Sequence, residues 1–143
     1  MKRTIIALAA VVVLTAGIAV ATPSRGFTTK LLGSGTIDSL SIQESEPSTA
    51  LFNRAEIEPG GTSGWHSHPA DVFNLVKQGR VAVINEGDCA PTVYTKGEIF
   101  HQTPGQVHKA YNVGDDEAVV IGTFLGVPPG AATLTDEANP CLA

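Results

Sequence analysis

This chain of 143 residues has few charged residues and only two cysteines, and it shows little helical patterning. Only 16% of the residues are charged, and 9 basic residues face 14 acidic ones without forming a cluster, which argues against a nucleic acid or an anionic membrane as partner. Beyond the N-terminal apolar run, no window of ten or more residues keeps a helical period, which excludes a helical fold. The two cysteines form no C-x-x-C pair, and neither has a histidine beside it, so the sequence does not indicate a cysteine nucleophile.

The one long apolar run begins the chain. Lys2 and Arg3 precede an apolar segment from Ile5 to Ala21, and Ala19-Val20-Ala21 fits the small-x-small rule for cleavage. These are the three parts of a secretory signal peptide, so the sequence predicts removal of residues 1–21 and a secreted or periplasmic protein without a stable membrane partner. The alternative is an uncleaved N-terminal anchor, because a run of this length is at the lower limit for a membrane span.

Cys89 and Cys141 both lie in the part that is predicted to be exported. Outside the cytosol, two cysteines most often form a disulfide. Such a bridge would tie the C-terminal tail to the body of the domain and would stabilise the fold by ~4 kcal/mol in the chain-entropy model. Two free thiols are the alternative.

Short strand patterns with turn signals between them make up most of the remaining chain. We expect strands at residues 50–58 (followed by a turn at Pro59-Gly60-Gly61), 72–77, 80–85, 92–95, 98–102, 107–113 and 117–126. Gln78-Gly79, between the second and third of these, predicts a hairpin. The pattern predicts an all-β jelly-roll barrel over residues 50–126, with an N-terminal arm at 22–49 that adds an edge strand and a tail at 127–143. A barrel of this kind can hold a small ligand.

His66 and His68 are the first candidate site residues. They are two apart on an expected strand, so alternation directs both side chains to the same face. If that face lines the barrel, two imidazoles meet at one place in the interior. The pair is better explained as metal ligands than as two unrelated histidines.

The residues around this pair resemble the two sequence motifs of the cupin superfamily. The first family motif is a glycine, five residues, His-x-His, three or four residues, Glu, six residues and a glycine, and this chain has Gly60, His66, His68 and Gly79. The second is a glycine, five residues, Pro-x-Gly, two residues, His, three residues and Asn, and this chain has Gly97, Gly105, His108 and Asn112, with Thr103 in place of the proline. The resemblance implies a cupin barrel in which His66, His68 and His108 bind one metal.

Val72 occupies the position where the family motif has its glutamate, and a valine cannot bind a metal. Three hypotheses follow. In the first, the three histidines alone hold one divalent ion of iron, manganese, nickel, copper or zinc. In the second, a bulge turns Asp71 inward as a fourth ligand, although the pleat would otherwise direct it away. In the third, no metal binds and the histidines shape a polar pocket.

His101 is a further pocket candidate if its face of the strand is interior, and a surface or core position is the alternative. By resemblance to three-histidine cupins, the chain is predicted to be an exported metal-binding protein that acts on or binds a small molecule. If it is an enzyme, it is a dioxygenase-like oxidoreductase. A non-catalytic extracytoplasmic module for a small ligand or a metal is the alternative. The family also allows a homodimer, but no interface can be located in the sequence.

Overall fold

The computed structural model describes residues 22–37 and 47–142, and all regular secondary structure in these ranges is β. The predicted signal peptide lies outside the described residues. Within them, no helix has the length and apolar character needed to cross a bilayer. The strands, in chain order, are β1 (Arg25–Ile37), β2 (Ser48–Thr62), β3 (His66–Ser67), β4 (Asp71–Gln78), β5 (Arg80–Asn85), β6 (Pro91–Thr95), β7 (Ile99–Gln102), β8 (His108–Asn112), β9 (Ala118–Val127) and β10 (Thr135–Asp136).

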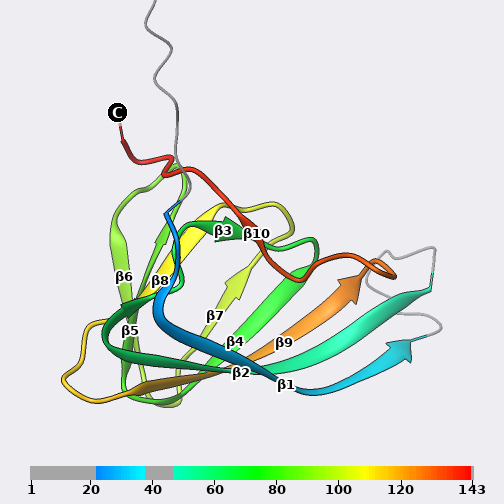
Figure 1. Ribbon diagram of the computed structural model, residues 1–143, viewed down its shortest axis with the longest axis horizontal. Helices are drawn as coiled ribbons and strands as arrows, with labels where there is room; N and C mark the ends of the chain where they lie inside the picture. Colours follow the sequence, from blue (N-terminus) through cyan, green and yellow to red (C-terminus); the bar gives the residue numbers. More distant parts are fainter. Residues whose placement is uncertain (1–21, 38–46, 143) are drawn as a thin grey trace, which may run out of the picture.

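Strand pairing joins these ten strands in one continuous antiparallel sheet. It folds into two halves that face each other, and each half is called a sheet below (Figure 1). One sheet has the order β1-β2-β9-β4-β7 and the other the order β10-β3-β8-β5-β6. In the described part of the chain, the ladders of the two sheets meet only where Thr62, at the end of the long β2, pairs with Tyr111. This is the predicted all-β jelly roll, a double-stranded β-helix.

The prediction of a hairpin at Gln78-Gly79 is wrong. β4 pairs with β7 and β9, whereas β5 pairs with β6 and β8, so the chain crosses from one sheet to the other at Gly79. Gly79 has a φ of 79°, and a Cβ at this position would lie 2.8 Å from the Cα of Ala118. A hairpin and a corner between sheets both favour glycine here, so local sequence could not separate them.

The N-terminal arm adds an edge strand, as expected. β1 runs for 13 residues and pairs with β2 from Arg25↔Thr62 to Ile37↔Ser48. The sequence of the arm shows only a short apolar step, but the neighbouring β2 offers a long row of backbone donors and acceptors. Pairing with an existing edge needs few apolar side chains.

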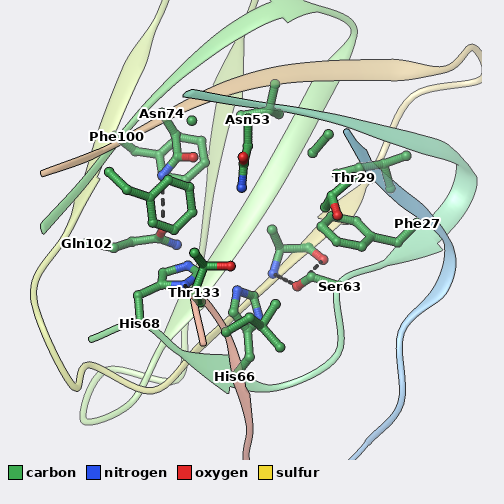
Figure 2. A pocket seen from close by; sticks show the side chains of 17 residues that line it. Phe27, Thr29, Asn53, Ser63, His66, His68, Asn74, Phe100, Gln102 and Thr133 are labelled. Atoms are coloured by element: carbon green, nitrogen blue, oxygen red, sulfur yellow. Dashed lines mark hydrogen bonds between the residues drawn. The ribbon is translucent and has the colours of Figure 1, made fainter. Parts of the chain in front are cut away.

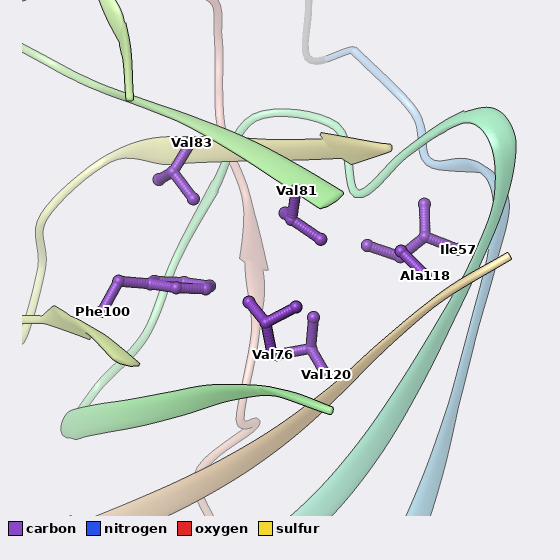
Figure 3. Packing of buried hydrophobic residues seen from close by; sticks show 7 residues of the cluster. All are labelled: Ile57, Val76, Val81, Val83, Phe100, Ala118 and Val120. Atoms are coloured by element: carbon purple, nitrogen blue, oxygen red, sulfur yellow. The ribbon is translucent and has the colours of Figure 1, made fainter. Parts of the chain in front are cut away.

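Apolar side chains from both sheets fill much of the space between them (Figure 3). The larger cluster consists of Ile57, Val76, Val81, Val83, Phe100, Ala118 and Val120. Full burial of each valine or larger side chain contributes about 1.5–3 kcal/mol. A smaller cluster contains Ala70, Val72, Phe124 and Val127. Members of both clusters also border the cavity described below.

The C-terminal tail returns across the molecule after β9, as the orange and red trace in Figure 1 shows. It forms the short strand β10 against β3, and it ends near β6. There Cys141 forms a disulfide with Cys89, which lies in the turn between β5 and β6. The predicted disulfide is therefore confirmed.

Candidate metal centre

Three histidines, two on the neighbouring strands β3 and β8 and one directly after β3, lie together inside the barrel. His66 on β3 is the register partner of His108 at the start of β8, and His68 follows two residues after His66. One ring nitrogen from each of the three comes within 4.8 Å of the others. All three side chains are buried, and His108 is 0% exposed. The regular strand at His66 is only two residues long, but the alternation that directs both histidines inward is kept.

Each of these histidines uses its Nδ1 atom for a hydrogen bond to a backbone carbonyl. Nδ1 of His66 lies 3.0 Å from the oxygen of Gly64, and Nδ1 of His108 lies 2.8 Å from the oxygen of Gln106. Nδ1 of His68 lies 2.7 Å from the oxygen of Thr133. A carbonyl oxygen can only accept, so each Nδ1 carries the proton and each Nε2 presents a lone pair.

Nε2 of His108 is a buried nitrogen without a hydrogen-bond partner in the described residues. Buried polar atoms are nearly always paired, so an orphan of this kind needs an explanation. Its lone pair lies close to the Nε2 lone pairs of His66 and His68, so a divalent cation that binds imidazole fits these three atoms well. Carbonyl partners at Nδ1 are also the usual way in which metal-binding histidines are oriented.

Burial keeps this cluster neutral. Desolvation lowers the pKa of His108 from 6.5 to about 3 and that of His68 to about 4, and it lowers the pKa of His66 as well. The neighbouring His66 adds a smaller electrostatic contribution in the same direction for the other two. Neutral imidazole is the form that binds metals, so at neutral pH no proton has to leave before an ion can enter.

His66 and His68 form one end of a cavity of about 110 Å³ (Figure 2). A cavity of ~150 Å³ accommodates benzene, so this one suits a molecule of only a few heavy atoms. Much of the lining is apolar, including Phe27, Ile57, Phe100, Val120 and Phe124. Its polar lining residues include Thr29, Asn53, Ser63, Asn74, Gln102 and Thr133, together with His66 and His68.

A buried pair of amide side chains stands out in this lining. Nδ2 of Asn74 on β4 donates to Oε1 of Gln102 on β7 at 2.9 Å, and both residues are buried. Asn53, on β2, extends toward the same space (Figure 2). The pair satisfies one donor and one acceptor, so the NH₂ group of Gln102 keeps hydrogens for a ligand in the cavity.

Val72 lies on the inward face of β4 together with Asn74 and Val76, and it is 1% exposed. The position is therefore interior, as the motif implied for its glutamate. Asp71 lies on the opposite face. Its Oδ1 accepts a hydrogen bond from Nε2 of His101 at 2.7 Å, and it is not part of the cluster of ligand atoms. The bulge that would have turned Asp71 inward is absent there, because the β4–β9 register shifts only after Val76.

His101, the pocket candidate, does not line the cavity. It is exposed on the outer face of β7 and stacks on Phe73 with ring centroids 4.5 Å apart. Its neighbours Phe100 and Gln102 lie on the opposite face of the strand and point into the cavity instead.

Sequence reasoning missed Asn53, Asn74, Gln102 and Thr133 as residues of the site. Strand alternation could have indicated two of them. Asn74 lies two residues after Val72 and therefore on the same face of its strand, and Gln102 lies next to His101 and therefore on the opposite face. No such signal exists for Thr133, because its carbonyl reaches His68 across 65 residues of sequence.

Comparison with known proteins agrees with this architecture. The family model described as "Cupin domain" matches residues 53–132. The chain belongs to the cupin family. Both the fold and the placement of the two histidine motifs in this cupin are those that the resemblance implied.

Curated relatives of this cupin include plant proteins. Germin-like protein 3-8 of Oryza sativa subsp. japonica is 37% identical over 83 residues, which cover 55% of this chain and 37% of that protein. Oxalate oxidase 1 of Hordeum vulgare is 33% identical over 86 residues, which cover 55% of this chain and 43% of that protein. The matched region is thus less than half the length of these relatives.

Solved structures show the same relationship. An oxalate oxidase in complex with the substrate analogue glycolate superposes with a TM-score of 0.52 at 32% identity, covering 57% of this chain and 44% of the other. A protein with a double-stranded β-helix domain from Klebsiella pneumoniae has a TM-score of 0.59 at 21% identity, covering 83% and 91%. The second likeness bears on the fold alone.

Proposed function

We propose that this cupin binds one divalent metal ion through the Nε2 atoms of His66, His68 and His108, and oxidises a small anion in the cavity. The observation that carries the proposal is the convergence of three buried, neutral imidazoles with their Nε2 lone pairs free, one of them an orphan. Iron, manganese, nickel, copper and zinc all accept imidazole ligands. When bound, such an ion would supply Lewis acidity and, if redox-active, electron transfer.

The charge balance of the site favours an anionic ligand. Three neutral histidines leave the charge of a divalent ion unbalanced, and Val72 replaces the one carboxylate of the motif. Among the residues that the structure describes, no acidic one lines the cavity. The amide donors of Asn53 and Gln102 would receive the far end of a short anion.

Small carboxylic acids are the first candidates for that anion. The size of the cavity limits the ligand to a few heavy atoms. Relatives named oxalate oxidase, one of them solved with glycolate, support two-carbon acids in particular. Oxidation of such an acid by dioxygen is the reaction we propose for this chain.

We also propose that the protein works outside the cytoplasm, with residues 1–21 as its signal peptide. The disulfide between Cys89 and Cys141 supports this location, because such bonds persist in oxidising compartments.

The metal content of the mature protein tests the first part of the proposal. Protein exported by its host and purified without chelators or metal-affinity resin should hold near one equivalent of a single metal. His66→Ala/His108→Ala should hold none, while His101→Ala, which changes a histidine outside the cluster, should match the wild type. A wild type that arrives empty and takes up none of the five metals on reconstitution would reject the site.

Oxygen consumption tests the second part. The metal-loaded protein should consume dioxygen with oxalate, glycolate or another acid of two to four carbons, and His108→Ala should not. If such an acid raises the melting temperature without any turnover, the protein is instead a non-catalytic binding module.

A further inference from the structure

We propose that the C-terminal tail positions His68 for the metal, and that the Cys89–Cys141 disulfide sets how firmly the site retains its ion. This inference rests on the proposed metal site. It concerns residues 133–141, which neither sequence motif includes.

The three histidines differ in what orients them. His66 and His108 donate from Nδ1 to carbonyls only two residues away, those of Gly64 and Gln106. His68 donates to the carbonyl of Thr133 at 2.7 Å, 65 residues later in the chain. The proton position and ring orientation of His68 therefore depend on the tail, whereas those of the other two depend on their own loops.

The tail is attached to the site by few interactions of its own. β10 pairs with β3 over two residues, Thr135↔Ser67 and Asp136↔His66. Glu137 adds two hydrogen bonds, from its backbone nitrogen to the oxygen of Trp65 at 2.9 Å and from the hydroxyl of Ser67 to its carboxylate at 2.8 Å. A two-residue ladder at an edge is a weak attachment by itself.

The disulfide supplies the strong attachment at the far end. Cys141 is bonded to Cys89, whose backbone nitrogen donates to the oxygen of Asn85 at 3.0 Å. Asn85 ends β5 and is the register partner of His108 on β8. The bond therefore links the segment that orients His68 to the sheet that carries His108. Figure 2 shows Thr133 beside His68 at the edge of the cavity.

Breaking this link has a defined chemistry. A phosphine reductant gives two electrons to the S–S bond, which becomes two thiols with protons from water, and the phosphine takes the water oxygen as its oxide. Cys89 is exposed, so a reductant can reach the bond. The tail then keeps only the contacts around β10, and the Thr133 carbonyl leaves His68 more often.

The test compares wild type with Cys89→Ser/Cys141→Ser. Affinity for Co²⁺ and Zn²⁺ is measured by competition with a chromogenic chelator, and folding is checked by thermal melting. We expect the variant to lose about tenfold or more in metal affinity, the usual cost of losing the partner that orients a metal-binding histidine. Phosphine should lower the affinity of the wild type in the same way and leave that of the variant unchanged.

A second readout separates positioning from general loosening. Long-range proton–nitrogen NMR spectra of the metal-free protein report the tautomer of each histidine. Loss of the disulfide should disturb the Nδ1–H signal of His68 and leave those of His66 and His108 in place. If the double variant does not fold, phosphine reduction of the wild type tests the disulfide. Glu137→Ala, which removes the hydrogen bond from Ser67 and keeps the disulfide, then tests positioning by the tail through the same metal affinity and NMR signals, and Glu117→Ala is its control for lost charge.

Equal metal affinity with and without the disulfide, or equal disturbance of all three histidines, would overturn the inference while leaving the metal site intact. Failure of the oxidised wild type to bind metal would overturn the proposed function. The NMR result for His68 would still decide whether the tail positions that side chain.

Discussion

Burial acts differently on the two kinds of polar side chain in the cavity. It lowers the pKa of the histidines, so that they stay neutral and keep their Nε2 lone pairs. The amides of Asn74 and Gln102 do not titrate, and burial only makes their remaining hydrogen-bond donors more costly to leave unpaired. One group of residues is suited to a cation and the other to the anion that we propose as its companion.

Val72→Glu should convert the site into one with a protein carboxylate. In the metal-free protein the buried charge should lower the free energy of unfolding by about 3–5 kcal/mol, because it has no partner. Added metal should restore more stability to this variant than to wild type. Thermal melting with and without Zn²⁺ measures both effects.

Val76→Glu is the matched control for that variant. Val76 lies on the same face of β4 and is equally buried, but it packs in the larger apolar cluster. Its carboxylate should destabilise the fold without rescue by metal. Rescue of both variants, or of neither, would show that position 72 does not face the ion.

The Asn74–Gln102 pair should control anion binding without affecting metal binding. Replacing both with leucine leaves neither amide unpaired, so stability should change by less than about 1.5 kcal/mol. Loss of hydrogen bonds to a charged ligand should weaken oxalate binding about tenfold or more. Calorimetric titration of the metal-loaded protein with oxalate measures this, and an unchanged oxalate affinity would remove the pair from the anion site.

At the scale of elements, the corner at Gly79 allows β4 and β5 to join different sheets. The residue combines a positive φ with a close approach to Ala118 on β9. Neither β4 nor β5 could keep its partners if the chain did not change sheets at this point. The corner therefore controls how the strands that flank the cavity are arranged.

Gly79→Ala should destabilise the protein more than Gly87→Ala. Both glycines have positive φ, for which an alanine costs about 1–2 kcal/mol. At Gly79 the new Cβ also meets Ala118 at 2.8 Å, whereas nothing lies within 4 Å at Gly87. Urea denaturation compares the two variants, and equal losses would show that the corner relaxes freely.

At the scale of the whole molecule, the buried histidines couple stability to pH. In the unfolded chain a histidine takes up a proton near pH 6.5, whereas the folded protein resists it down to about pH 4 for His68 and about pH 3 for His108. Between these values the unfolded state binds more protons, so stability is fully present above pH 6.5 and is lost as the pH falls.

The free energy of unfolding of the metal-free protein should therefore decrease below pH 6.5, by up to about 1.4 kcal/mol per pH unit for each histidine. Urea denaturation between pH 4.5 and 8 measures the slope. His66→Ala/His108→Ala lacks two of these histidines and should show a shallower decrease. Carboxylates contribute equally to the slopes of both proteins, so they drop out of the difference between the slopes. An equal slope would mean that these histidines titrate normally in the folded state.

Much of this protein could be predicted from sequence because its signals are local. Strand bounds follow from short apolar-rich runs with turn signals between them, and β5 was predicted over its full observed range, residues 80–85. His66, His68 and His108 were found because short motifs specify both their spacing and their face of the strand. The same alternation could have placed Asn74 and Gln102 in the cavity.

Only the tertiary structure decided features that depend on distant segments. The partners of β4 and β5 differ because sheet pairing is chosen by packing across the barrel, and the Gln78-Gly79 pair permits either outcome. Asp71 points away because the pleat of β4 is set by its ladder with β9, so its carboxylate pairs with His101 instead. The carbonyl that orients His68 comes from a tail 65 residues away, and no local pattern of residues encodes a contact between backbone and side chain at that distance.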